Sequence, residues 1–289
     1  MNSLKFNPLH TDFGARVSGL DLTSRLSVDD LEQLRQAIDT YSLLCFPGQQ
    51  MTDVKQLELT RQLGEPEAEH VTFGKTGKVE YFGTVGNILD DGTKKDNADA
   101  NTKFQTGNQL WHSDSSFRET PSYVSILQAY EVPDEGGATE FVSMRAAHER
   151  LPEELRQRID LLYVIHDYVF SRSQVAPVDP NHAASLPPVR HQLVRENPGN
   201  GKKNLYIGSH ARSIPGMSGI DSRQLLDDLL ERTTRPEDIY AHQWQVGDTV
   251  IWDNRCVLHR GTGYDADRWR RRLRQTRVIG AEKGLIPSP

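Results

Sequence analysis

Hydrophobic residues in the first quarter of the chain recur at two different spacings. Apolar positions three or four residues apart follow Ser27, and this spacing predicts a helix that the serine and its acidic neighbours cap. The apolar run 42–46, which a Pro-Gly pair ends, predicts a short buried strand. A second helix is predicted over about 52–63, with Gly64 at its C-terminal end. The positions that define the first helix are Leu31, Leu34, Ile38 and Tyr41.

Short apolar runs dominate the rest of the chain, with few helical patterns between them. One helix is predicted to begin at Pro152, and another after Asp221, whose side chain would cap a leucine-rich segment. Residues 171–203 are predicted to form loops and short strands. Because strands do not alternate regularly with helices, the pattern favours a mainly β fold, a barrel or sandwich with flanking helices. The longer predicted strands are 123–131, 139–142, 204–208 and 249–252.

The segment 85–109 is polar and rich in Asn, Asp, Gly and Lys. A loop of this length inside a compact domain is usually functional or disordered. Because the segment leads into candidate metal ligands, we expect an active-site lid here. We treat residues 1–289 as a single domain, since no repeat or low-complexity segment divides them.

Composition narrows the possible classes of protein. Hydrophobic residues make up 36% and charged residues 26% of the chain, as in an ordinary soluble globular protein. The net charge of −6 argues against a nucleic-acid or membrane-surface partner. The sequence shows neither a long apolar run nor a signal sequence, so we expect a cytoplasmic protein. We also expect it to form a homo-oligomer. Cys45 and Cys256 lie in apolar runs, which predicts two buried, reduced thiols.

Two histidines and an aspartate are the candidate metal ligands. His112 and Asp114 lie two residues apart, so in an extended segment both side chains would emerge on one face. The pair alone is a weak signal, since the same pattern occurs at His10 and Asp12. His259 adds support, because it ends an apolar run in which an unpaired polar ring would be costly. Two histidines and one carboxylate form the facial triad of non-haem iron(II), whereas a structural zinc site would need four ligands.

Arginines crowd the stretch 268–277. Strand alternation would place the even-numbered residues, Arg270 and Arg274 among them, on one face, and the odd-numbered residues with Leu273 on the other. An arginine that faces the interior needs an anion, because an unpaired buried charge is heavily penalised. Arg270 and Arg274, roughly 13 Å apart along a strand, could hold different anions around one metal. A basic surface strand, a nucleic-acid patch, and pairing of Arg274 with an internal Asp or Glu are the alternatives.

Three segments carry a family resemblance, namely 108–117, 136–141 and 252–261. Together with the arginine spacing, they resemble the taurine dioxygenase and 2,4-dichlorophenoxyacetate dioxygenase superfamily, and the second branch more closely. The resemblance covers essentially the whole chain. It implies a double-stranded β-helix, or jelly roll, flanked by helices, with iron(II) as the metal and 2-oxoglutarate and dioxygen as cosubstrates.

The resemblance also implies roles for nine residues. Iron(II) would be held by His112, Asp114 and His259, the distal carboxylate of 2-oxoglutarate by Thr139 and Arg270, and the substrate by Arg274, Asn108, His70 and His210. His70 could equally be a solvated loop histidine, and His210 a packed histidine at a strand end. The region 68–107 departs from the aryloxyacetate-cleaving members, so a herbicide substrate does not follow from the resemblance.

The implied reaction converts 2-oxoglutarate to succinate and carbon dioxide while hydroxylating a C–H bond of a small carboxylate or sulfonate. Hydroxylation beside an ether oxygen would cleave the ether, as in aryloxyalkanoate degradation. The same chemistry on a specialised-metabolism or amino-acid-derived substrate is an alternative. Two other classes stay open, a zinc-dependent hydrolase on the same three ligands and a nucleic-acid-binding protein that uses 268–277. The hydrolase gives Arg270 and Thr139 no role, and the acidic net charge speaks against the nucleic-acid-binding protein.

Overall fold

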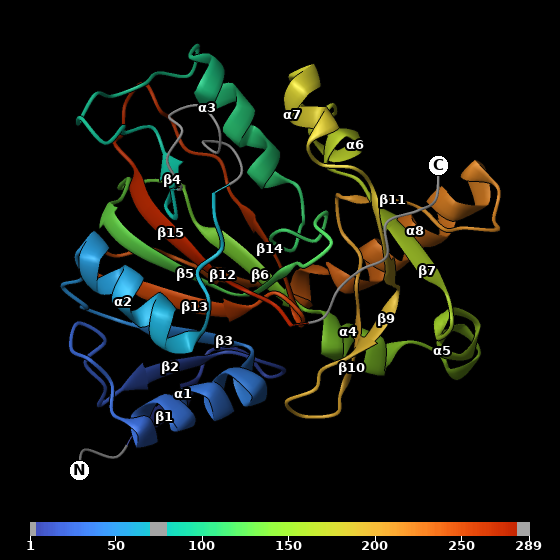
Figure 1. The fold of residues 1–289 in the computed structure, drawn as a ribbon, viewed down its shortest axis with the longest axis horizontal. Coiled ribbons are helices and arrows are strands. Elements are labelled where there is room, and N and C mark those ends of the chain that lie inside the picture. The colour runs from blue at the N-terminus through green and yellow to red at the C-terminus, as the bar shows by residue number, and fades with distance from the viewer. Residues whose placement is uncertain (1–3, 70–79, 282–289) are drawn as a thin grey trace.

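The computed structural model describes residues 4–69 and 80–281. One seven-stranded sheet and three smaller sheets form its framework, and helices pack around them (Figure 1). A mainly β fold with flanking helices, the double-stranded β-helix that was predicted, is therefore confirmed.

The main sheet has the strand order β1-β2-β3-β13-β5-β15-β4. Its neighbouring strands are antiparallel, except that β2 runs parallel to β3. The strands are β1 (Lys5–Pro8), β2 (Ala15–Ser18), β3 (Leu43–Phe46), β4 (Gly83–Gly86), β5 (Ser122–Glu131), β13 (Thr249–Asp253) and β15 (Arg272–Ile279).

A smaller antiparallel sheet, β12-β6-β14, packs against the main sheet, and His259 of β14 lies between the two sheets. The remaining strands form the sheets β11-β7-β8 and β10-β9. Their bounds are β6 (Thr139–Ser143), β7 (Tyr163–His166), β8 (Val189–Gln192), β9 (Val194–Glu196), β10 (Lys203–Leu205), β11 (Ala211–Ser213), β12 (Tyr240–His242) and β14 (Val257–Gly261).

The helices begin and end close to the predicted positions where a cap was recognised. Ser27 caps the first helix and Gly64 ends the second, as predicted. The leucine-rich helix is capped by Ser218 rather than Asp221, because the serine hydroxyl accepts the N–H of Asp221 from outside the helix. The helices are α1 (Val28–Tyr41), α2 (Asp53–Leu63), α3 (Ala100–Gln105), η1 (Thr106–Gln109), α4 (Met144–Arg150), α5 (Glu153–Ile159), α6 (Tyr168–Arg172), α7 (Pro180–Ala184), α8 (Gly219–Thr233) and η2 (Pro236–Asp238).

The segment 85–109 is not an irregular loop throughout, as its polar composition had suggested. It carries the end of β4, then α3 and η1, and Val85, Leu89 and Asn108 from it line the site. Its motion as a lid stays a prediction.

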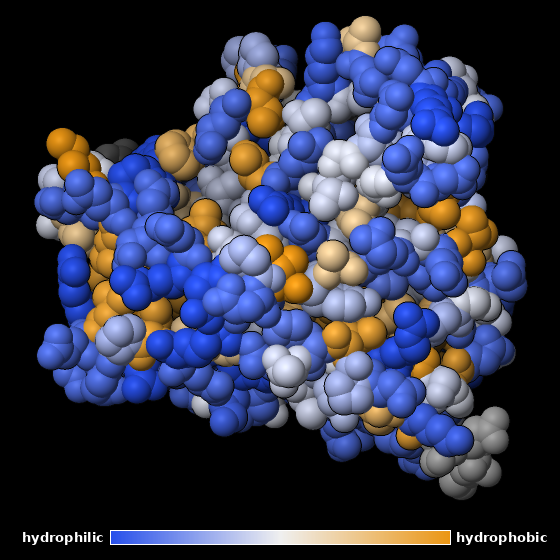
Figure 2. Space-filling view, turned by 180° about the vertical axis from the view of Figure 1, so that it is seen from behind, coloured by the Kyte–Doolittle hydropathy of each residue, from blue (hydrophilic) through white to orange (hydrophobic). Residues whose placement is uncertain are grey.

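Apolar side chains form three clusters. One fills the space between the main sheet and helices α1 and α2, the second lies between the main sheet and β12-β6-β14, and the third lies beneath α4 and α8. Cys45 and Cys256 are buried and free, as predicted, and burial raises the pKa of the Cys45 thiol to about 12. The face seen from behind is mainly hydrophilic, with hydrophobic residues in small separate groups (Figure 2). Among the described residues, no helix has the length and apolarity that a bilayer crossing requires.

Candidate active site

His112, Asp114 and His259 lie together between the two facing sheets. One candidate ligand atom of each lies within 4.8 Å of those of the others. Asp114 Oδ1 is 3.9 Å from His112 Nε2 and 3.7 Å from His259 Nε2. The two histidines are also paired through their backbones, since each N–H donates to the other's carbonyl oxygen. The predicted candidate ligands are therefore brought together by an antiparallel bridge between β14 and the segment after η1.

Hydrogen bonds orient the two ligands that come from the 112–114 segment. The Nδ1 of His112 donates to the carbonyl oxygen of Leu110 at 2.7 Å, which leaves the Nε2 lone pair free. Ser125 and Gln275 both donate to Oδ2 of Asp114, at 2.5 and 2.8 Å. Oδ1 therefore remains the carboxylate oxygen that is available to a metal ion.

The protonation states suit a divalent cation. Burial lowers the pKa of His112, and burial and the neighbouring His112 lower the pKa of His259 to about 3, so both rings are neutral near pH 7. Burial alone would raise the pKa of Asp114, but the charge of Arg277 and the hydrogen bond from Ser125 are among the contacts that outweigh it, and the pKa is lowered. Two neutral imidazoles and one carboxylate, with further positions open, form the donor set that non-haem iron(II) takes.

Thr139 and Arg271 reach the same cavity as the three candidate ligands. Arg271 is 5% exposed, and its guanidinium donates to the carbonyl oxygens of Val85 and Gly137. No carboxylate among the described residues forms an ion pair with it, and burial lowers its pKa to about 10. The Thr139 hydroxyl accepts from Trp244 Nε1 at 2.9 Å, so its own hydrogen can be donated into the cavity.

The prediction that Arg270 faces this cavity is wrong. Its side chain is 47% exposed and pairs with Glu131 at 2.5 Å on the surface. Arg271, directly before β15, and Gln275 within it are the side chains that line the cavity of the candidate ligands. Strand parity was assigned to the wrong face because β15 is covered on both sides, by the cavity and by α2.

A larger cavity of about 260 Å³ adjoins the candidate ligands on the side of α3 and α6. Arg274 lines it, but Asp53 at 3.0 Å and Asp90 at 2.6 Å already accept from its guanidinium. The structure therefore contains the internal ion pair that was the alternative for this residue. The expectation that a guanidinium at this position needs an external anion is wrong, since Asp53 of α2 and the exposed Asp90 supply two carboxylates, whereas a role for Arg274 in substrate binding stays a prediction.

Two further predicted substrate residues line the larger cavity. Asn108 accepts from Arg172 Nη2 at 2.9 Å through its side-chain oxygen. His210 is buried, with its Nδ1 3.1 Å from the hydroxyl of Ser116 and its ring packed against Phe117. His70 lies outside the described residues. Sequence reasoning missed Arg172 and Gln275, because neither belongs to a motif.

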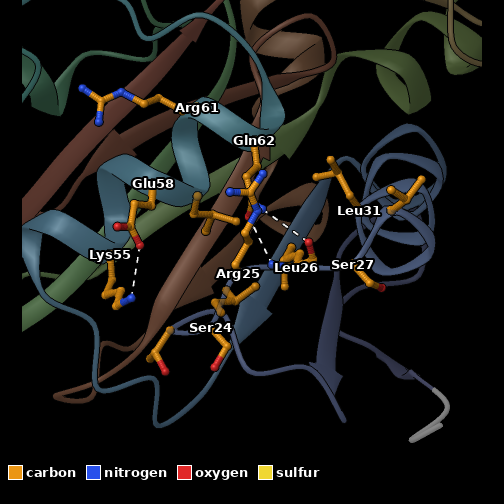
Figure 3. A pocket seen from close by; sticks show the side chains of 13 residues that line it. Ser24, Arg25, Leu26, Ser27, Leu31, Lys55, Glu58, Arg61 and Gln62 are labelled. Atoms are coloured by element: carbon orange, nitrogen blue, oxygen red, sulfur yellow. Dashed lines mark hydrogen bonds and ion pairs between the residues drawn. The ribbon is translucent and has the colours of Figure 1, made fainter.

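A second buried group of potential metal ligands and a larger pocket lie elsewhere among the described residues. Cys45, His242 and Asp248 also form a buried group, but His242 Nε2 and Asp248 Oδ2 already share a hydrogen bond at 3.1 Å, which satisfies both without an ion. The pocket in Figure 3 is larger, about 790 Å³, and lies between residues 22–31 and α2. Its charged side chains are exposed, as in the ion pair of Lys55 and Glu58, and the candidate metal ligands are not among its lining residues.

A family model described as "Taurine catabolism dioxygenase TauD, TfdA family" matches residues 5–277. The chain belongs to this family. A 2,4-dichlorophenoxyacetate dioxygenase of Cupriavidus pinatubonensis, named as alpha-ketoglutarate-dependent, is 37% identical over 96% of this chain and 98% of its own length. An (S)-phenoxypropionate/alpha-ketoglutarate dioxygenase of Sphingobium herbicidovorans is 34% identical, with 94% of each chain covered. The crystal structure of AAD-2 with Mn(II) and N-oxalylglycine superimposes with a TM-score of 0.89 at 35% identity, covering 99% of this chain and 100% of that chain.

The range matched by the TauD, TfdA family model contains every residue of both cavities. Family membership and the suggested resemblance to 2,4-dichlorophenoxyacetate dioxygenases are thus confirmed.

Proposed function

We propose that the protein is an iron(II)- and 2-oxoglutarate-dependent dioxygenase that hydroxylates a C–H bond of a small organic anion. His112, Asp114 and His259 would hold the iron, and Arg271 with Thr139 would hold the distal carboxylate of 2-oxoglutarate. Cytoplasmic location, self-association and the lack of a nucleic-acid partner stay predictions from the sequence.

The observation that carries this proposal is the buried Arg271 guanidinium beside the three candidate ligands. A buried arginine without a carboxylate partner among the described residues is unfavourable unless an anion joins it. A dicarboxylate that reaches from the metal to Arg271 would provide that anion, with a bidentate contact that a guanidinium favours. A zinc hydrolase on the same three ligands would give Arg271 and Thr139 no such role.

The position of each side chain in the cavity indicates its role in the proposed reaction. When bound, iron(II) and 2-oxoglutarate supply the oxidation of a C–H bond by dioxygen, with release of succinate and carbon dioxide. Arg271 and Thr139 orient the cosubstrate, while Ser125 and Gln275 keep Oδ2 of Asp114 occupied so that the carboxylate binds through Oδ1. Val85, Leu127 and Trp252 supply the apolar part of the cavity wall.

The test is an oxygen-uptake and succinate assay with iron(II), ascorbate and 2-oxoglutarate over a panel of carboxylates and sulfonates, aryloxyacetates and 2-aryloxypropionates among them. We expect at least one acid to stimulate uptake, and alanine variants at 112, 114 and 259 to abolish it, since an open three-ligand site has no spare ligand. His10→Ala is the matched control, because His10 belongs to the other His-x-Asp pair and bonds only to backbone at the surface. Turnover without oxygen and 2-oxoglutarate would refute the proposal in favour of a hydrolase.

A further inference from the structure

The hydroxyl group of Thr139, the first residue of β6, lines the cavity of the candidate ligands. Its oxygen accepts a hydrogen bond of 2.9 Å from Nε1 of Trp244. An indole N–H can only donate, so the hydroxyl cannot donate in that direction. Within residues 4–69 and 80–281, no group accepts the hydrogen of this hydroxyl. The hydroxyl of Thr139 therefore has a donor to offer and needs an acceptor.

The indole of Trp244 is held in place by contacts that do not involve the hydroxyl. Trp244 follows β12, whose last residue, His242, is paired with Thr139 across the β12 and β6 ladder. The rings of His242 and Trp244 meet nearly at right angles, with centroids 4.6 Å apart. Asp248 closes the turn, because its Oδ2 accepts from the His242 ring at 3.1 Å and from the N–H of Gln245 at 3.0 Å. The buried pair of His242 and Asp248 thus supports the indole without a metal ion.

The guanidinium of Arg271 approaches the same end of β6. It donates to the carbonyl oxygen of Gly137, two residues before Thr139, and it lines the same cavity. A guanidinium has donors and no acceptor, so it makes the same demand on a ligand as the hydroxyl of Thr139. An ionised carboxylate, which has only acceptors, meets both demands, whereas a methyl group meets neither.

We propose that Trp244 is a positioning residue for 2-oxoglutarate: its indole N–H fixes the Thr139 hydroxyl as a donor and so adapts this end of the cavity to an ionised carboxylate. Trp244 is not among the residues that line the cavity, so it acts through Thr139. The inference rests on the proposed function, in which Thr139 and Arg271 hold the distal carboxylate of the cosubstrate. Removal of this N–H should therefore change the affinity for that carboxylate and for no other part of the ligand.

The experiment measures binding by calorimetry without oxygen, in protein loaded with iron(II). The two ligands are 2-oxoglutarate and 2-oxovalerate, in which a methyl group replaces the distal carboxylate. Trp244→Phe keeps an aromatic ring and removes the N–H. We expect it to weaken 2-oxoglutarate about fivefold, the effect of losing one hydrogen bond of typical strength. The affinity for 2-oxovalerate should change less than about twofold, because its methyl group cannot accept a hydrogen bond from Thr139.

A double-mutant cycle provides the second arm of the experiment. Thr139→Val removes the oxygen to which the indole donates, so adding Trp244→Phe to it should change the affinity for 2-oxoglutarate less than about twofold. In Thr139→Ser, which keeps a hydroxyl, the loss of about fivefold should return. Trp269→Phe is the matched control, since its ring stacks on Arg268 and it lines neither cavity. It should leave the affinity for both ligands unchanged.

The inference is overturned if Trp244→Phe weakens both ligands equally, if it weakens neither, or if the loss is as large beside Thr139→Val. In the first and last cases the indole acts through packing rather than through its N–H. Thermal unfolding identifies variants that fail to fold. If Trp244→Phe is one of them, replacement of Trp244 by 3-benzothienylalanine, in which sulfur takes the place of the N–H, decides by the same comparison. Failure of the proposed function is a separate result, since the wild type would then show no iron-dependent binding of 2-oxoglutarate.

Discussion

A single guanidinium, that of Arg271, links the geometry of the site to its proposed cosubstrate. Arg271→Leu should raise the KM for 2-oxoglutarate by roughly 30-fold to several thousandfold, because loss of one partner of a buried charge pair costs about 2–5 kcal/mol. Arg270→Leu is the adjacent control and should change the KM little, since Arg270 pairs with Glu131 at the surface. Steady-state kinetics with varied 2-oxoglutarate measures both. If Arg270→Leu raised the KM for 2-oxoglutarate more than Arg271→Leu does, Arg270 would be the residue that binds the cosubstrate, as expected from the sequence.

Gln275 acts on the metal through Asp114 rather than by touching it. Its amide is one of two donors to Oδ2 of Asp114, so Gln275→Leu should hold the carboxylate less firmly and weaken metal binding. Changes in groups that orient a ligand typically cost about 10- to 100-fold in metal affinity. Anaerobic titration with iron(II), or with Mn(II) in air, gives the dissociation constant, and Gln174→Leu at an exposed glutamine is the control. An unchanged constant would show that Ser125 alone suffices to hold Asp114.

The three candidate ligands could be predicted, whereas the partners of the arginines could not. His112, Asp114 and His259 are recognisable because their residue types, spacing and apolar context together indicate one chemistry. Arg274 and Asp53 are 221 positions apart in the chain, and no local sequence pattern predicts that they are in contact. Whether an arginine needs an external anion depends on such distant carboxylates, so its role follows only from the tertiary structure.

Strand β15 shows how an element can be located correctly and still be misread. A strand in this region was expected, and β15 indeed lies in the main sheet, between β5 and the edge strand β4. Its residues are buried on both faces, by Gln56 and Thr60 of α2 on one side and the cavity on the other. A polar pattern cannot assign the inward face when both faces hold buried polar groups. A register shift between Arg272 and Leu273 further interrupts simple alternation at the start of the strand.

The end of β4 positions Arg271 by a close backbone approach, which gives an element-level prediction. Gly86 has φ +142°, and a Cβ there would lie 1.9 Å from the carbonyl oxygen of Arg271. Gly86→Ala should therefore displace Arg271, lowering both thermal stability and affinity for 2-oxoglutarate. Gly92→Ala is matched to it, since Gly92 also has a positive φ, +82°, but open space around the Cβ position. Equal losses in the two variants, measured by thermal unfolding and 2-oxoglutarate titration, would rule out the close approach as the cause.

At the scale of the whole molecule, a buried cluster of charges joins segments that are far apart in the chain. Arg277 of β15 bonds to Glu67 and Glu69 after α2, and Glu67 also accepts from Ser115 and Ser122. The cluster ties the main sheet to the segment that carries Asp114. A mainly β barrel or sandwich was predictable from the many short apolar runs. These links were not, since each of the charged residues taken alone is typical of a protein surface.

Removal of Arg277 tests whether this cluster supports the fold as a whole. Arg277 is 6% exposed, so Arg277→Leu would leave Glu67 and Glu69 buried without their shared cation. Breaking a buried pair by removing one partner destabilises a protein by about 3–5 kcal/mol. Arg268→Leu is the control, because Arg268 pairs with Glu135 while 62% and 77% of the two side chains are exposed, and such pairs contribute about 1 kcal/mol or less. Urea unfolding measures the free energy of both variants. Replacing Glu67 and Glu69 by glutamine in the Arg277→Leu background should recover part of the loss, because the two carboxylate charges that Arg277 balances are then removed. If the double replacement brings no recovery, the loss comes from packing around Arg277 rather than from its charge.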